Sequence, residues 1–130
     1  MSLNKLQVTQ TNTLSTSPSQ NEPRGARRQE IQAAMERLWL EDPEQFNPMR
    51  DCVQRKRVSR TIDALRQLAP LAGKRAVDLG CGSGVITRLI RDLKMDVLAI
   101  DAATRALELL KKGDMDKITA AQDCLPTTRL

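Results

Sequence analysis

The stretch that decides the fold is Ala76-Val77-Asp78-Leu79-Gly80-Cys81-Gly82-Ser83-Gly84, a short apolar run that leads directly into three alternating glycines. A helical pattern follows at once, with apolar residues at Val85, Ile86, Leu89, Ile90 and Leu93. A glycine turn between a strand and a helix brings bare backbone, and the unpaired N–H groups of the helix start, close to a ligand. This segment therefore predicts a strand, a ligand-binding loop and a helix.

The residues after the glycine loop continue the alternation of strand and helix. The apolar spacing predicts strands at 76–79, 97–100 and, more weakly, 118–121, with helices at 85–93 and 103–112. Gly113 is expected to stop the second of these helices. Strands that alternate with helices form parallel β-α-β units with right-handed crossovers, so the expected fold class is α/β with a Rossmann-like parallel sheet.

The N-terminal half of the chain is expected to be helical after a disordered tail at residues 1–23, which are rich in Ser, Thr, Gln and Asn. A first helix is predicted at about 27–40. Asp42-Pro43 and Asn47-Pro48 each place a capping residue before a proline, and the second pair is expected to open a helix that reaches residue 68. We therefore divide the chain into a tail (1–23), a helical segment (24–73) and a partial α/β domain (74–130).

The apolar pattern of the predicted second helix changes along its length. Its later part carries a stripe that suits packing against a sheet, at Val58, Ile62, Leu65 and Ala69. Met49 and Val53 point to roughly the opposite side. The early part of this helix is therefore either a lid over a ligand or an ordinarily packed element.

Charge and composition exclude several function classes. The net charge of +5 comes entirely from residues 51–75, where a solvated basic face is favoured over a nucleic-acid surface. The two aromatic residues, Trp39 and Phe46, are too few for a platform that stacks single-stranded bases. Nucleic acid is therefore an admissible partner, but not the favoured one.

Cysteine and histidine usage points away from metal sites and disulfides. The three cysteines, Cys52, Cys81 and Cys124, are far apart, and the chain has no histidine. A zinc site and histidine-activated nucleophiles are therefore not expected. The sequence also lacks a run of membrane-spanning length and the apolar segment of a signal peptide. We expect no membrane partner and a reduced, cytoplasmic location.

Three features are expected to meet at the carboxyl edge of the predicted sheet, where open parallel sheets bind their ligands. They are the loop 80–84, Asp101 after the second strand, and Asp123 after the third strand. Asp101 lies 21 positions after Gly80, the separation at which an acidic side chain reaches the hydroxyl pair of a ribose. The glycines read G-x-G-x-G rather than the G-x-G-x-x-G of dinucleotide-binding loops. Asp78, just before the loop, would repel a pyrophosphate and attract a cationic amino acid group.

The chain resembles the class I S-adenosylmethionine-dependent methyltransferases in three linked motifs: Val77–Gly84, Ala99-Ile100-Asp101, and Gln122-Asp123-Cys124-Leu125-Pro126. The resemblance implies a methyltransferase with S-adenosylmethionine as cofactor and a methyl-acceptor substrate that these residues do not identify. It also implies that Asp78 and the loop (Gly80, Cys81, Gly82, Gly84) hold the methionine part. Asp101 and the adjacent Ala102 would bind the ribose, and Asp123 with the backbone of Cys124 would meet the adenine. No catalytic residue and no metal ligand are assigned.

Other interpretations of the same residues stay open. The glycine turn joins a strand and a helix tightly even without a ligand, Asp101 is also placed to cap a helix, and Asp123 is an acid in a loop. Cys81 suits a small residue tolerated in the loop better than a nucleophile, because no base is placed to activate it. At the level of function, the alternatives are a non-catalytic assembly protein with this fold and, on the glycines alone, a nicotinamide-dependent oxidoreductase.

The resemblance also implies that the family's sheet continues beyond the third strand, with a fourth strand beside the first. We therefore expect a truncated domain, a fragment that binds cofactor weakly and does not catalyse by itself. Strand 76–79 would then be an apolar edge through which the chain associates with another copy.

Overall fold

The computed structural model describes residues 24–124 of the chain. Its elements are α1 (Arg24–Glu41), the 3-10 helix η1 (Pro43–Phe46), α2 (Cys52–Arg66), β1 (Arg75–Leu79), α3 (Val85–Asp92), β2 (Asp96–Asp101), α4 (Thr104–Lys111) and β3 (Ile118–Gln122). The alternation predicted from residue 76 onward is confirmed, with boundaries that differ by only one residue. The expected tail at 1–23 lies outside the described residues, and the division at residues 73 and 74 stays a prediction.

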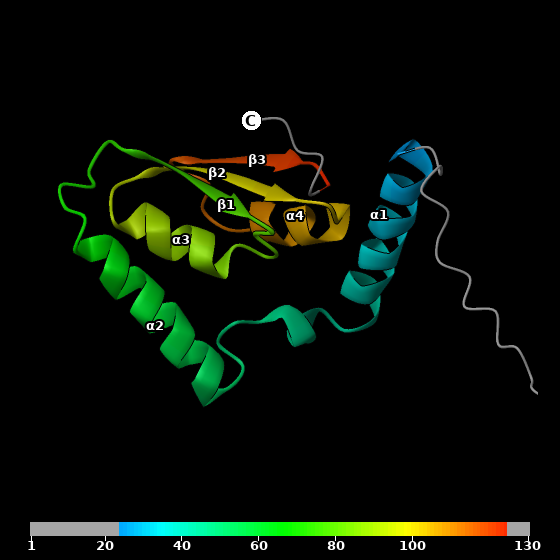
Figure 1. Cartoon of the computed structure of the whole chain (residues 1–130), viewed down its shortest axis with the longest axis horizontal. Helices are drawn as coiled ribbons and strands as arrows, with labels where there is room; N and C mark the ends of the chain where they lie inside the picture. The colour runs from blue at the N-terminus through cyan, green and yellow to red at the C-terminus, as the bar shows by residue number, and fades with distance from the viewer. Residues whose placement is uncertain (1–23, 125–130) are drawn as a thin grey trace, which may run out of the picture.

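The three strands form one parallel sheet in the order β1-β2-β3. In Figure 1 the strands run toward α1, so that their carboxyl ends face this helix, and α3 and α4 lie together on one face of the sheet. The predicted Rossmann-like α/β fold is therefore confirmed. This arrangement follows from right-handed crossovers between neighbouring strands.

The core lies between this face of the sheet and the helices. Val97 on β2 packs with Ile90 on α3 and with Val58 and Ile62 on α2. Two residues further along the same strand face, Ala99 packs with the α4 residues Leu107 and Leu110. Because alternate residues of a strand point to the same side, one strand face organises all three helices.

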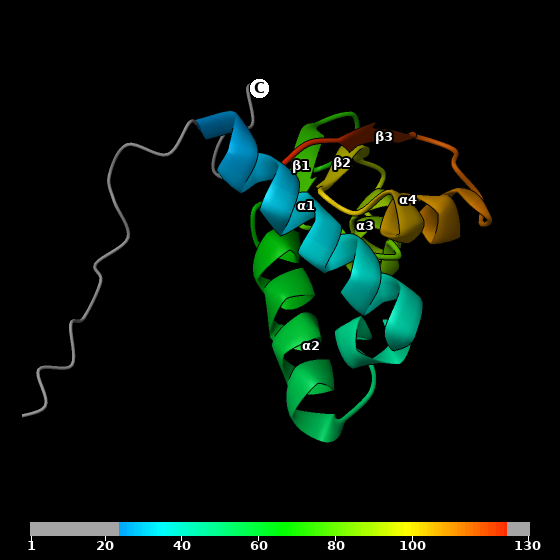
Figure 2. The same cartoon turned by 90° about the vertical axis from the view of Figure 1, so that its right-hand side faces the viewer.

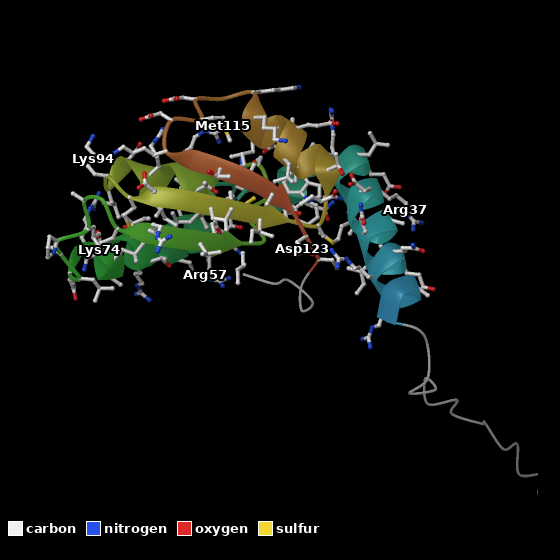
Figure 3. All side chains as sticks on the ribbon, turned by 90° about the horizontal axis from the view of Figure 1, so that it is seen from above. Arg37, Arg57, Lys74, Lys94, Met115 and Asp123 are labelled. Atoms are coloured by element: carbon white, nitrogen blue, oxygen red, sulfur yellow. The ribbon has the colours of Figure 1, made fainter. Side chains whose placement is uncertain are left out.

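The opposite face of the sheet is not covered by any helix among residues 24–124, and it faces the viewer in Figure 3. Val77 and Leu79 on β1 are 45% and 47% exposed. Within the described residues β1 pairs only with β2, so its other edge is open. The apolar edge expected from the sequence is therefore present in the structure, whereas self-association through it stays a prediction.

The start of the second helix was predicted wrongly. α2 begins at Cys52, and its N-cap is Asp51, whose carboxylate accepts a hydrogen bond from the Gln54 N–H at 2.8 Å. The Asn47 side chain instead accepts from the Met49 N–H at 2.9 Å, which makes a local turn. The turn satisfies the Asn47 oxygen within two residues, so the helix starts at the next capping residue.

The ends of the apolar pattern on α2 also differ from expectation. Val58 and Ile62 are buried as predicted, but α2 ends at Arg66 and Ala69 is exposed beyond it. Val53 is 63% exposed and Met49, which precedes the helix, is 40% exposed. The start of α2 is therefore neither a packed element nor a lid, because its apolar side chains face outward. Gly113 does follow α4, but with ordinary backbone geometry rather than a left-handed cap.

Candidate functional site

The glycine loop is held by packing on one side and is open on the other. Gly84, the N-cap of α3, has a φ of +88°, and a Cβ placed there would lie 2.0 Å from Cδ1 of Leu110 on α4. Gly80 has a φ of +74°, and a Cβ there would meet nothing within 4 Å. Gly84 therefore serves the packing of the loop against α4, whereas Gly80 presents bare backbone to open space.

Asp78 brings a carboxylate to the open side of the loop. It lies on β1, and its Oδ2 accepts a hydrogen bond from the Thr87 hydroxyl at 2.6 Å. Burial raises the pKa of Asp78; the hydrogen bond from Thr87 opposes this shift, and the negative charge of Asp101 adds to it. A cation bound beside Asp78 would relieve this unfavourable environment.

Asp101 ends β2 and holds the glycine loop against the sheet. It is 7% exposed. Its Oδ2 accepts from the Gly82 N–H at 2.8 Å, and its Oδ1 accepts from the Ala103 N–H at 2.9 Å. Each carboxylate oxygen has a second lone pair, so the group keeps capacity for a ligand hydroxyl.

Asp101 does not cap the following helix, so this interpretation of the residue is wrong. α4 begins at Thr104, and its N-cap position is Ala103, whose side chain makes no capping hydrogen bond. The first free N–H groups of α4 are taken by Glu36 of α1, which accepts from Thr104 and, at 3.1 Å, from Arg105. Burial alone would raise the pKa of Glu36, but these hydrogen bonds lower it below its ordinary value.

Asp123 follows β3 at the same edge of the sheet. Its carboxylate forms an ion pair with Arg28 of α1 and accepts from the Cys124 N–H at 2.8 Å. Figure 3 shows Asp123 at the end of β3, beside α1. The neighbouring Gln122 side chain donates to the Ala102 carbonyl at 3.1 Å. The groups predicted to meet the adenine are thus engaged with α1 and with each other.

Cys81 is buried beneath the loop rather than poised for reaction. Its thiol is 8% exposed and lies 3.6 Å from the Gly82 carbonyl oxygen. Burial, together with the charges of Asp101 and Asp78, raises the pKa of Cys81 to about 12. The thiolate needed for nucleophilic attack is therefore scarce at neutral pH.

A cavity of about 240 Å³ joins part of the predicted site. Five of the nine predicted cofactor residues line it: Asp78, Gly80, Cys81, Gly82 and Asp101. Gly84, Ala102, Asp123 and Cys124 do not. A larger cavity of about 540 Å³ lies at the other end of the sheet, along the first residues of the strands. In parallel sheets ligands bind at the carboxyl ends, which favours the smaller cavity.

Sequence reasoning missed the residues that cover this cavity, which are Met35 and Trp39 of α1, Phe46 of η1, and Pro48. α1 crosses in front of the carboxyl ends of the strands, as Figure 2 shows. One signal was available, because the chain's only two aromatic residues flank Asp42-Pro43 at a separation of seven positions. The pattern did not show which surface they cover.

Two further searches of residues 24–124 returned nothing. Within this range there is no cluster of three or more His, Cys, Asp or Glu side chains that would hold a metal ion. The same residues include no helix of the length and apolarity that crossing a membrane requires.

Comparison with known proteins gives relatives with one shared description, although no family model matches the chain. A ubiquinone biosynthesis O-methyltransferase from Ralstonia nicotianae is 31% identical over 71 residues, which are 55% of this chain and 28% of that protein. A protein of the same description from Burkholderia pseudomallei is 41% identical over 69 residues, with 53% and 28% covered. The chain thus spans less than a third of the curated relatives that it matches.

Among solved structures, the chain is similar to an S-adenosylmethionine-dependent methyltransferase from Mesorhizobium loti. The TM-score is 0.45 at 32% identity, over 52% of this chain and 33% of that one. A second similar structure is a methyltransferase from Geobacter sulfurreducens in complex with S-adenosyl-L-homocysteine. Its TM-score is 0.43 at 23% identity, over 75% and 36% of the two chains.

Proposed function

The chain is a relative of the class I S-adenosylmethionine-dependent methyltransferases, and we propose that it is the cofactor-binding portion of such an enzyme. One observation carries the proposal. The cavity at the carboxyl edge joins the bare backbone of Gly80 to two carboxylates, Asp78 and Asp101, and none of its lining residues is basic. A ligand with a positive charge and hydroxyl groups fits this set of groups.

In this proposal each group has one task. Asp78 faces the amino group of the methionine part, Gly80 and Gly82 let the ligand approach the backbone, and Asp101 accepts from the ribose hydroxyls. S-Adenosylmethionine supplies an electrophilic methyl group, so the protein contributes mainly by positioning it. Gly84, Ala102, Asp123 and Cys124 act around the cavity rather than in its wall. The acceptor stays unspecified, because the chain spans only part of its relatives.

Isothermal titration of the full chain with S-adenosylhomocysteine tests this proposal. Asp101→Asn is expected to weaken binding by roughly 10- to 100-fold, since charged hydrogen bonds to the ribose hydroxyls are lost. Asp96→Asn is the matched control, because Asp96 is exposed at the other end of the same strand. Tighter binding of NADH than of S-adenosylhomocysteine would overturn the proposal in favour of an oxidoreductase.

The cellular setting is part of the proposal. No disulfide links the cysteines within residues 24–124, and Cys52 is exposed, which supports a reducing, cytoplasmic compartment. The basic side chains of α2, including Lys56, Arg57 and Arg60, are exposed to solvent. We favour a solvated surface there over a nucleic-acid surface.

The open edge of β1 supports self-association of the isolated chain. Val77 and Leu79 are exposed next to unpaired backbone groups of an edge strand, and such edges pair with other chains. Sedimentation velocity at rising concentration measures this. Val77→Lys is expected to reduce the associated fraction, and an unchanged fraction would contradict the edge model.

A further inference from the structure

The chain's two aromatic side chains come together over the glycine loop. Trp39 on α1 and Phe46 on η1 stack with ring centroids 4.6 Å apart and an interplanar angle of 21°. They are the only tryptophan and the only phenylalanine in a chain without tyrosine. Trp39 is 3% exposed, whereas Phe46 is half-buried. The pair is therefore a fixed part of the structure rather than a surface contact.

Trp39 rests directly on the loop. A Cβ placed on Gly82 would lie 3.1 Å from Cζ2 and 3.2 Å from Cη2 of the indole ring. Trp39 also packs with Ala103 and Ala106 at the start of α4, in a cluster that includes Leu109. Gly82 thus leaves room for an aromatic ring, and this ring closes the cavity that Gly80 opens.

The electrostatics of the cavity are one-sided. Its lining residues include the carboxylates Asp78 and Asp101, the two aromatic rings, and no lysine or arginine. Aromatic faces carry a partial negative charge and attract cations, most strongly in the case of tryptophan. Every electrostatic element in the wall therefore favours a ligand with a positive charge.

We propose that the Trp39–Phe46 pair recognises the positively charged sulfonium centre of the cofactor, and so makes the chain prefer the methylated cofactor to its uncharged thioether product. The inference rests on the proposed function, because it concerns the same cavity. It goes further in assigning charge recognition to residues that lie outside the glycine motif. It also explains why this chain keeps its two aromatic residues at this position.

The single tryptophan makes the test direct, since all tryptophan fluorescence comes from the ring in question. The full chain is titrated with S-adenosylmethionine, with S-adenosylhomocysteine, and with sinefungin, which carries an amine in place of the sulfonium. Each ligand that binds is expected to change the Trp39 emission. The two cationic ligands are expected to bind about tenfold more tightly than the thioether.

Variants then separate recognition from packing, with calorimetry as the measure of binding. Phe46→Leu and Trp39→Leu are expected to bring the preference for cationic ligands close to one, while thioether binding changes by less than about threefold. Trp39→Phe keeps an aromatic ring and is expected to keep most of the preference. Leu109→Ala, which loosens the same cluster without removing a ring, is the matched control and is expected to leave the preference unchanged.

The outcomes distinguish this inference from the proposed function. If neither cofactor form binds the wild-type chain, both fall. If the wild-type chain binds both forms equally, or if Phe46→Leu keeps the full preference, charge recognition by the pair is overturned and the proposed function stands. Should Trp39→Leu fail to fold, Phe46→Leu and Trp39→Phe still decide the question.

Discussion

The helices on the two sides of the glycine loop are attached to the protein in different ways. α4 lies against the sheet through the buried side chains Ala106, Leu107 and Leu110, which recur at helical spacing. α1 has one buried side chain, Trp39, and exposes Leu38 and Leu40. It is held by Glu36 on the start of α4 and by Arg28 on Asp123. A helix that packs by periodicity is legible in a sequence, whereas one that docks by a few distant contacts is not.

The same contrast extends to the cysteines, where the largest difference is expected. Cys81 lies buried in the loop with a pKa of about 12, whereas Cys52 is exposed on α2. A raised pKa means that the thiolate is scarce below that pH. At neutral pH Cys81 therefore holds roughly a thousandfold less thiolate than an ordinary thiol.

Iodoacetamide labelling followed by peptide mass spectrometry measures the difference. Cys52 is expected to react quickly, and Cys81 only after unfolding in urea. Equal labelling of the two residues in the folded chain would show that the loop is not packed as described. Urea-unfolded chain, in which both thiols are ordinary, serves as the control.

Gly84→Ala attacks the packed side of the loop. The added Cβ would lie 2.0 Å from Leu110 and in left-handed backbone, so we expect a loss of about 3 kcal/mol or more in the free energy of unfolding. Gly80→Ala is the control, because it adds the same strain without a clash, and about 1–2 kcal/mol is expected. Urea denaturation followed by circular dichroism gives both values. Equal losses would contradict the assignment of Gly84 to packing.

Arg88→Met attacks the connection between the loop and the end of α4. The Arg88 guanidinium donates to the carbonyls of Ser83 and Gly84 at 3.0 and 3.2 Å, and also to the carbonyl of Leu110. Loss of these charged hydrogen bonds is expected to cost about 2 kcal/mol in unfolding free energy. Arg91→Met, which removes an ion pair with the exposed Asp114, is expected to cost less than about 1 kcal/mol. The reverse order would overturn the role given to Arg88.

Glu36→Gln addresses the docking of α1 and is expected to have the smallest effect, about 1 kcal/mol in unfolding free energy at neutral pH. The pKa of Glu36 is lowered in the folded chain, so its contribution is complete above the unfolded value of about 4.3. It is lost as the pH falls through the lower, folded value. The difference between wild type and variant should therefore shrink in acid.

The control for this variant is Glu30→Gln, an exposed change on the same helix. Unfolding curves at several pH values should separate wild type from Glu36→Gln near neutrality and bring them together at the acid end. A pH-independent difference would mean that the charge of Glu36 does not hold the start of α4.

Much of the sheet was predictable because its signals are local. Three strands and two helices follow from apolar spacing after residue 75, and Asp78, Gly80 and Asp101 come together because parallel strands end at one edge. The second helix was placed too early because Asn47 and Asp51 are both capping residues. Only the surrounding structure shows that Asn47 closes a turn on the Met49 N–H instead.

By itself the sequence determined the parallel sheet and the identity of its ligand edge, since periodicity and glycine spacing act over a few residues. The tertiary structure decided how that edge is covered. Trp39 reaches Gly82, Glu36 reaches Thr104 and Arg28 reaches Asp123 across long stretches of chain, and no local pattern records such pairings. It also divided the three glycines, because only the fold shows that Leu110 lies against Gly84 while Gly80 faces open space.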